Sequence, residues 1–189
     1  NTMPNFTKMA IKATFLRLLD EKPLSQITVK EIVEECGVNR NSFYYHFQDI
    51  PALVEEILTE AADQIIAAYP AIDSLEGCLN AAVEFAMKNR RGVLHIYHSV
   101  NRDIFEQYLW KIAHHVVKAY ADSLFAEKPL KESDREVIVR FYEGECFGMV
   151  MKWMSEGMKD GIQEAISRLC ELRRGMVEEM IRRCLEGQP

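Results

Sequence analysis

The stretch that decides the fold is residues 27–47, which read ITVKEIVEECGVNRNSFYYHF. Thr28 stands before a short segment with apolar residues at helical spacing, and Glu31 follows three positions later, so the pair predicts a capping box. Gly37 suits the left-handed backbone conformation that ends a helix sharply. These signals predict two short helices joined by a tight turn, as in a helix-turn-helix.

The second of these helices is expected over residues 40–47, with Asn39 as its N-cap. Phe43 and Phe47 lie four positions apart and are expected to face inward. The polar and aromatic side chains left for the exposed face are Arg40, Asn41, Ser42, Tyr44, Tyr45 and His46. Arginine can bind a guanine edge, asparagine an adenine edge, and hydroxyl and imidazole groups can contact phosphates. In the alternative interpretation, Tyr44 or Tyr45 packs against the neighbouring domain.

The whole chain is expected to be all-α. It would consist of an N-terminal three-helix helix-turn-helix module and a C-terminal helical ligand and dimerisation domain. Two long proline-free stretches, rich in helix-forming residues, support this assignment. About nine helices are expected, at residues 5–20, 28–36, 40–47, 49–69, 74–89, 92–100, 102–127, 133–160 and 162–186. The first is expected to bury a stripe that includes Phe6, Met9, Ala10, Ala13, Leu16 and Leu19. Gly92 and Asn101 are expected to separate neighbouring helices.

The composition excludes several classes of protein. Hydrophobic residues make up 48% and charged residues 28% of the 189 residues, which is typical of a globular chain. No apolar run is long enough to cross a membrane, and no signal peptide is recognised, so neither a membrane partner nor secretion is expected. The five cysteines are scattered without a CxxC pair, which favours the reducing cytoplasm over a disulfide framework or a zinc site.

The net charge is −6, yet it is not evenly distributed along the chain. Residues 1–50 contain six basic residues, Lys8, Lys12, Arg17, Lys22, Lys30 and Arg40, and equally many acidic ones. A neutral module forms few ion pairs with phosphates. If it binds DNA, we therefore expect modest non-specific affinity and a shallow dependence on salt concentration.

The segments 27–32 and 36–47 closely resemble the DNA-binding module of TetR-type transcriptional regulators, and the resemblance covers residues 5 to about 60. Within that family the chain is most similar to the branch of dihydroxyacetone-kinase regulators. A looser similarity to the C-terminal domain of that branch rests on Tyr142-Glu143-Gly144, Gly148, Trp153 and Gly157-Met158.

The resemblance implies a homodimer that places two recognition helices in successive major grooves of a pseudo-palindromic operator, in most members as a repressor. Carried over by position, Thr28 and Lys30 would contact phosphates, as would Tyr45 and His46. The full set of DNA-binding residues implied in this way is Thr28, Lys30, Asn39, Arg40, Asn41, Ser42, Tyr44, Tyr45 and His46. This chain has Ile50 where the family has a lysine at the start of the following helix, so one phosphate contact is missing.

The division of the chain is expected to be a DNA-binding domain over residues 1–50 and an effector-binding and dimerisation domain over residues 51–189. Gly144 and Gly148 lie four apart within one predicted helix, where close packing or a ligand would explain two glycines. The residues predicted for dimerisation are Gly144, Gly148, Met154, Ile166, Leu169, Met176 and Met180. In the alternative, these helices pack only within one chain.

The middle helices combine apolar side chains with aromatic and polar tips, a mixture that can line a pocket for a small molecule. The candidate effector-binding residues are Phe85, Tyr97, His98, Phe105, Tyr108, His114 and Tyr142. Ordinary core packing with some surface histidines is the alternative for each of them. The identity of the effector is not encoded in any recognisable pattern.

The main rival hypotheses are a metal-responsive regulator and a helical metal-binding enzyme, both using His95, His98, His114 and His115. The Glu-x-x-His pairs of di-iron bundles are absent from the sequence, as are HExxH, a glycine-rich phosphate loop and GxSxG. We therefore expect no enzymatic activity, no cofactor and no metal. Cys146 and Cys170 could sense oxidants, although a buried structural cysteine is the more common case.

Overall fold

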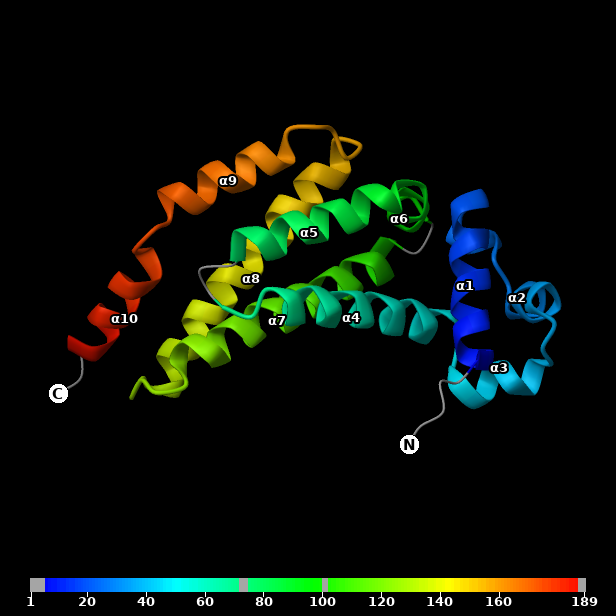
Figure 1. Ribbon diagram of the computed structural model, residues 1–189, viewed down its shortest axis with the longest axis horizontal. Helices are drawn as coiled ribbons and strands as arrows, with labels where there is room; N and C mark the ends of the chain where they lie inside the picture. Colours follow the sequence, from blue (N-terminus) through cyan, green and yellow to red (C-terminus); the bar gives the residue numbers. More distant parts are fainter. Residues whose placement is uncertain (1–5, 72–74, 100–101, 187–189) are drawn as a thin grey trace. The chain divides into compact units, whose positions relative to one another are not determined.

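The computed structural model of the chain describes residues 6–71, 75–99 and 102–186, and these residues form helices and connecting turns without a strand (Figure 1). The predicted all-α fold is confirmed. The elements are α1 (Phe6–Glu21), a 3₁₀ helix (Leu24–Gln26), α2 (Val29–Cys36), α3 (Arg40–His46), α4 (Ile50–Ala68), α5 (Leu75–Lys88), α6 (Arg90–Tyr97), α7 (Arg102–Phe125), α8 (Glu132–Ser155), α9 (Ile162–Leu172) and α10 (Met176–Glu186).

The helices form two compact units. Unit 1 comprises residues 1–61 and 88–108, and unit 2 comprises residues 62–87 and 109–189. Unit 1 therefore contains α1, α2, α3 and α6, while α4 and α7 contribute residues to both units. The predicted division into a DNA-binding domain over residues 1–50 and an effector-binding and dimerisation domain over residues 51–189 stays a prediction.

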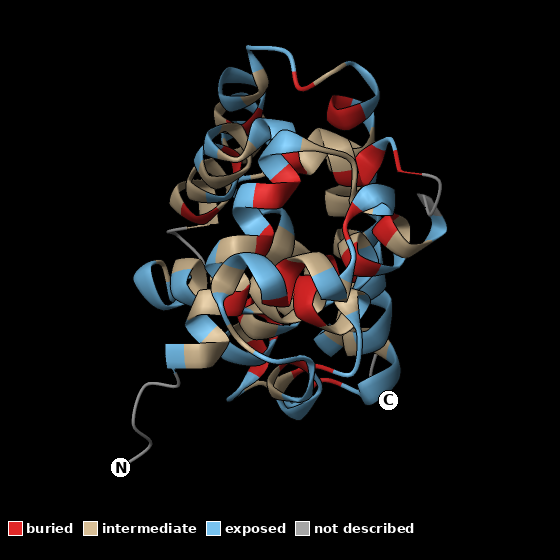
Figure 2. Cartoon of the chain, turned by 90° about the vertical axis from the view of Figure 1, so that its right-hand side faces the viewer, coloured by how far each residue is buried: buried red, intermediate tan, exposed pale blue. Residues whose placement is uncertain are grey.

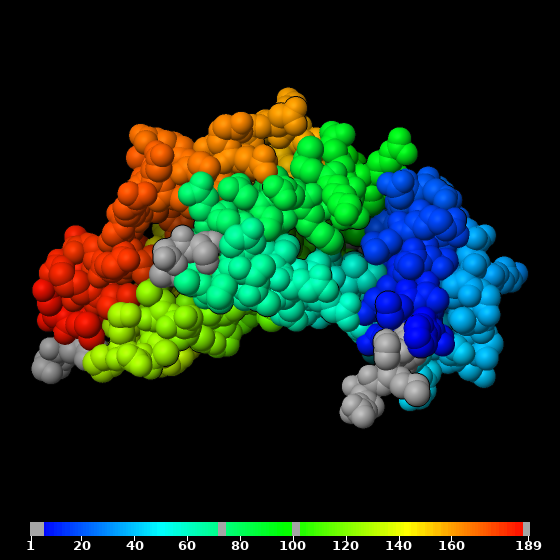
Figure 3. Space-filling model, in the orientation of Figure 1, coloured from blue at the N-terminus to red at the C-terminus, as the bar shows by residue number. Residues whose placement is uncertain are grey.

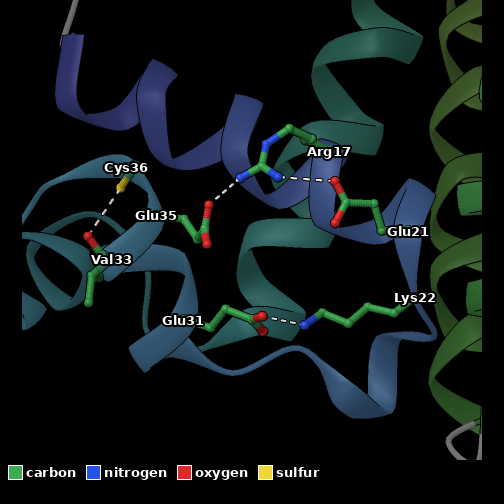
Figure 4. A network of polar contacts seen from close by, with 7 residues as sticks. All are labelled: Arg17, Glu21, Lys22, Glu31, Val33, Glu35 and Cys36. Carbon is green, nitrogen blue, oxygen red and sulfur yellow. Dashed lines mark hydrogen bonds and ion pairs between the residues drawn. The ribbon is translucent and has the colours of Figure 1, made fainter.

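The helix-turn-helix is formed as expected, with one difference at its first cap. Thr28 accepts a hydrogen bond from the Glu31 amide at 3.2 Å, and Gly37 adopts a φ of 71°, which ends α2. The Glu31 carboxylate, however, pairs with Lys22 Nζ instead of turning back to the Thr28 amide (Figure 4). Only half of the predicted capping box is therefore used, because a nearby cation is the stronger partner.

The buried face of α1 differs from the predicted stripe. Ile11, Phe15 and Leu18, at spacings of four and three, are buried together with Leu19. Of the predicted stripe, the large side chains Phe6, Met9 and Leu16 are exposed. Apolar residues occur on two faces of this helix, so spacing alone could not decide which face packs. Figure 2 shows how buried and exposed residues alternate along the helices.

Gly92 lies inside α6 rather than between two helices as predicted. A Cβ atom at this position would lie 3.4 Å from both Cγ and Cδ2 of Leu19, at the limit of an ordinary van der Waals contact, so α6 packs against α1 at this buried glycine. Asn101, the other expected boundary, falls outside the described residues. The glycine therefore serves packing within unit 1, a role that its sequence context did not indicate.

In unit 2, α8 ends at Ser155 and not near residue 160 as predicted. The chain reverses through Gly157 and Met158, both with positive φ, and the Met158 side chain is buried. The indole Nε1 of Trp153 donates to the carbonyl of Lys159 at 2.9 Å and fixes this turn. The burial of Met158 helps to explain why a residue other than glycine adopts the left-handed conformation there.

The predicted last helix, 162–186, is in fact two helices, so the described residues contain ten α-helices where about nine were expected. The break follows Leu172, and Gly175 takes a φ of 84°, which a continuous helix does not allow. Beyond it, Ile181 of α10 packs into a core cluster of unit 2 with Ala121, Phe125, Leu130 and Ile138.

We predict that Phe15→Ala lowers the free energy of unfolding by about 3–5 kcal/mol, because the ring is almost fully buried and its removal leaves a cavity. Phe6→Ala, in the same helix, is the matched control. Its ring is 76% exposed, so the change should stay within about 0.5 kcal/mol. Urea denaturation followed by circular dichroism measures both, and equal losses would contradict the assigned faces of α1.

Candidate nucleic-acid interface

The position of α3 is fixed at its start and on its inner side. The Asn39 side chain accepts hydrogen bonds from the Ser42 amide at 2.8 Å and from the Ser42 hydroxyl at 3.1 Å, which caps the helix as predicted. Phe43 and Phe47 are buried with their ring centroids 5.7 Å apart. The predicted inward orientation of the two rings is therefore confirmed, and it determines which side of α3 faces solvent.

The outer face of α3 carries the side chains that the sequence singled out. Arg40, Asn41, Tyr44 and Tyr45 are exposed, whereas Ser42 and His46 are half-buried. The Tyr45 ring is 83% exposed, so packing against a neighbouring part of the chain does not account for it. The light blue surface in Figure 3 includes α2 and the residues that lead into α3.

Arg40 and Tyr44 lie one helical turn apart and contact each other. Arg40 Nη2 lies 3.4 Å from the Tyr44 hydroxyl, and the guanidinium carbon lies 5.7 Å from the centre of the tyrosine ring. The Tyr44 ring in turn packs edge-on against buried Phe43, with 5.5 Å between ring centroids. Tyr44 thus links an exposed cation to the core of unit 1.

Most other cations of residues 1–50 are paired with carboxylates. Lys8 and Lys12 both contact Glu56, at 2.5 and 2.6 Å, and Lys12 also contacts Glu60 at 2.6 Å. Partial burial lowers the pKa of Lys12, but hydrogen bonds to Glu56 and Glu60 outweigh this effect, so its pKa is raised. Burial likewise raises the pKa of Glu56, and the two lysines more than reverse it.

The cations nearer to α2 are engaged in the same way (Figure 4). Arg17 contacts Glu21 at 3.0 Å and Glu35 at 2.6 Å, and Lys22 pairs with Glu31. Lys30, which is well exposed, has only the loose contact to Glu34 at 3.8 Å. Lys30 and Arg40 are therefore the cations of residues 1–50 that are least engaged by carboxylates of the same chain.

The predicted effector residues are divided between the two units. In unit 1, Tyr97, Phe105 and Tyr108 are buried, whereas His98 is exposed. The Tyr108 hydroxyl has no hydrogen-bond partner within the described residues, and burial, with Asp49 and Glu55 nearby, raises its pKa to about 12.

In unit 2, Phe85 is half-buried and His114 pairs with Glu143. Tyr142 alone of the predicted set lines a cavity of about 70 Å³. The sequence analysis did not select the other wall residues, which are Leu75, Leu79, Val116, Val117, Tyr120, Ala121, Leu124, Phe125, Ile138, Val139, Cys146, Arg173 and Val177. Most are aliphatic residues that resemble any other core position, so no signal in the sequence distinguished them.

The residues predicted for dimerisation divide into covered and open positions. Met154 and Ile166 are buried within their own chain, so their role in dimerisation stays a prediction. Leu169 and Met180 are half-buried, whereas Gly144, Gly148 and Met176 are exposed. The sequence analysis did not assign the large apolar residues Val137, Phe141 and Leu172 to dimerisation, yet all are exposed, at 67%, 52% and 62%.

Three of the histidines in the metal hypotheses contact different partners within the chain. His95 Nδ1 lies 2.7 Å from the Leu19 carbonyl, His114 pairs with Glu143, and His115 pairs with Asp63. The described residues contain no group of three or more potential ligands. No helix among them is long and apolar enough to cross a membrane.

The cysteines of the oxidant hypothesis are poorly suited to it. Burial raises the pKa of Cys146 to about 11, and Glu145 adds to this effect. The pKa of Cys170 is raised by burial as well. Because the thiolate is the reactive form, neither residue has the low pKa that is typical of a redox sensor.

Comparison with known proteins identifies the family. Residues 11–57 match the family described as bacterial regulatory proteins, tetR family, and residues 73–175 match the C-terminal region of transcriptional regulators. The uncharacterised HTH-type transcriptional regulator YxbF of Bacillus subtilis (strain 168) is 31% identical over 58 residues, which are 31% of this chain and 15% of that protein. The chain thus matches well under two thirds of the length of such curated relatives.

Two solved structures share the fold over nearly the whole chain. The dihydroxyacetone kinase operon activator DhaS has a TM-score of 0.67 at 15% identity, covering 91% of this chain and 96% of its own. The TetR family repressor AlkX from Dietzia sp. has a TM-score of 0.57 at 13% identity, covering 92% and 96%. The family match over residues 73–175 spans more than half of the chain. The chain therefore belongs to the TetR family of DNA-binding transcriptional regulators.

Proposed function

We propose that this regulator binds a pseudo-palindromic operator as a homodimer, represses transcription from it, and is released by a small molecule. Residues 1–50 would contact the DNA, and residues 51–189 would form the dimer and hold the effector. The work would take place in the cytoplasm, where the operator is accessible. The observation that carries the proposal is the outward face of α3, which presents Arg40, Asn41, Tyr44 and Tyr45 to solvent.

In this proposal each side chain on the DNA-facing surface has a role that fits its chemistry. Arg40 donates to a guanine edge and Asn41 binds an adenine edge, while Ser42 and Tyr44 contact bases or nearby backbone. Thr28 and Lys30 at the start of α2 contact phosphates, as do Tyr45 and His46. Asn39 contributes mainly by capping α3, because its side-chain oxygen is already used by Ser42.

The exposed apolar surface of unit 2 supports a dimer. Val137, Phe141, Gly144 and Gly148 follow one another at spacings of four, three and four along α8, so they share one face of this helix. A Cβ atom at either glycine would meet nothing within 4 Å in the same chain. Such a strip allows a second α8 to approach closely, and burying it would remove the large apolar side chains of Val137 and Phe141 from water.

Repression needs no contact beyond those already described, because a dimer bound to the duplex excludes other proteins from the same site. AlkX is a repressor by its title, whereas DhaS is an activator of its operon. Release by an effector requires that the ligand favours a dimer geometry in which the two recognition helices no longer fit successive grooves.

The first prediction concerns base recognition. Selection of bound duplexes from a random pool should yield a two-fold symmetric site, with half-sites about one helical turn or somewhat more apart. On the selected duplex, Arg40→Ala should weaken binding by about 1–3 kcal/mol and relax the preference at one position of each half-site, because a bidentate contact to guanine is lost. Fluorescence anisotropy measures the affinity.

Two further variants test whether the effect of Arg40→Ala is specific to base recognition. Tyr45→Ala should weaken all sequences about equally, since it removes a phosphate contact. Arg168→Ala, on exposed α9 with Glu171 as its ion-pair partner, is the control and should leave affinity unchanged. If Arg40→Ala left the affinity unchanged, the assignment of the reading face of α3 would be wrong.

The second prediction concerns salt. Because Lys8, Lys12, Arg17 and Lys22 are neutralised within the chain and Arg40 is assigned to a guanine edge, Lys30 is the main cation available for phosphates. One such contact per subunit corresponds to a slope of about −2 in log K against log salt concentration for a dimer. A titration of the selected duplex with potassium chloride measures the slope. A value near −8 would mean that the internal ion pairs open on binding.

The third prediction concerns assembly. Phe141→Glu should convert a dimer into a monomer at micromolar concentration, because it places a charge within the apolar strip of α8. Ala82→Glu, at an exposed position of α5, is the matched control and should stay dimeric. Sedimentation velocity measures the mass of both, with circular dichroism to check their folding. A monomeric parent protein would overturn the dimer.

A further inference from the structure

The cavity in unit 2 lies between α5, α7, α8 and the junction of α9 and α10. Its volume of about 70 Å³ exceeds the space that a single water molecule needs. A buried water also needs two to four polar partners, and the wall is mainly hydrocarbon, including Val116, Ala121, Leu124 and Val139. The cavity is thus better suited to an apolar molecule than to water.

The hydroxyl groups at the wall are already engaged. The Tyr120 hydroxyl donates to the carbonyl of Tyr69, and the Tyr142 hydroxyl lies 3.9 Å from the sulfur of Met180. A ligand with several polar groups would lose its hydrogen bonds to water and find few replacements here, which is unfavourable. The hydrogen-bonding capacity of the site therefore limits the ligand to a small number of polar atoms.

The single cation at the wall, Arg173, is also engaged. Its Nη1 lies 3.2 Å from Glu145 Oε2, and its guanidinium carbon lies 4.5 Å from the centre of the Tyr142 ring. Glu145 and Glu143 both raise the pKa of Cys146, a wall residue, against the opposing effect of Arg173. An anionic group in the cavity would therefore approach carboxylates, and Arg173 is not free to compensate for it.

We propose that this cavity binds an uncharged, mainly hydrocarbon ligand, with the size of a short alkyl chain or a single aromatic ring. The inference refines the proposed effector site, and it rests on the proposed function only for the ligand's role in regulation. Arg173 and Tyr142 are polar residues of the wall and accept a small polar group of the ligand at most. The rest of the wall is hydrocarbon, so each methylene group of the ligand that enters the cavity makes the binding free energy more favourable.

The test uses the homologous primary alcohols from ethanol to octanol, each compared with the carboxylate of equal chain length, and isothermal titration calorimetry on the full chain without DNA. The affinity of the alcohols should rise about fourfold per methylene until the cavity is full, and then fall. Carboxylates should bind at least about tenfold more weakly than the alcohols. The absence of saturable alcohol binding, or tighter binding of the carboxylates, would overturn the proposal.

Variants locate the binding site. Ala121→Leu fills the cavity and should weaken the best alcohol by about tenfold or more, whereas Ala82→Leu, on the exposed side of α5, should leave its affinity unchanged. Leu124→Ala enlarges the cavity and should move the optimum to alcohols two to three methylenes longer, which keeps the test decisive if Ala121→Leu does not fold. A folded Leu124→Ala protein with an unchanged optimum would place the ligand elsewhere.

Binding and regulation are then separated with the selected duplex. Alcohol binding without DNA release would reject the effector role and retain the ligand site. Failure of every alcohol to bind, while Arg40→Ala still weakens the DNA complex, would reject the ligand site and retain the DNA-binding proposal.

Discussion

The burial of Phe43 and Phe47 is the interaction on which the DNA-facing surface depends. Both rings lie on the inner side of α3, and Asn39 fixes the first turn through the Ser42 amide and hydroxyl. A helix of two turns has little stability by itself, so its orientation comes from this packing and from its cap. With the two rings inside, Tyr44 and Tyr45 between them are exposed, whereas His46 is half-buried.

Several cations of unit 1 form ion pairs between its helices and are therefore not available to DNA. They tie α1 to α2 and α4 through carboxylates: Arg17 bridges to Glu35, and Lys12 to Glu56 and Glu60. Exposed pairs of this kind contribute little each, yet together they remove most free positive charge from the module. In the proposed complex, affinity for DNA would then depend more on direct contacts to base edges and hydroxyl groups than on general attraction to phosphates.

Unit 2 combines two kinds of apolar surface with different consequences. The cavity is lined by side chains of its own unit and suits a small ligand, whereas the strip on α8 is exposed and suits another helix. Gly144 and Gly148 belong to the strip, where neither is required by backbone conformation or by packing within the chain. Their cost in helix stability fits the proposal that an α8 helix of a second chain packs against this strip.

The sequence by itself determined the helix-turn-helix, because its signals are local: the caps at Thr28 and Asn39, the turn at Gly37 and the four-residue spacing of Phe43 and Phe47. Only the tertiary structure decided which face of α1 is buried, that Gly92 packs against Leu19, and that Tyr142 shares a cavity with residues that had no recognisable pattern. These outcomes depend on contacts between residues far apart in the chain. An apolar side chain looks the same in the sequence whether it fills a core, lines a cavity or faces a partner, because the hydrophobic effect has no direction.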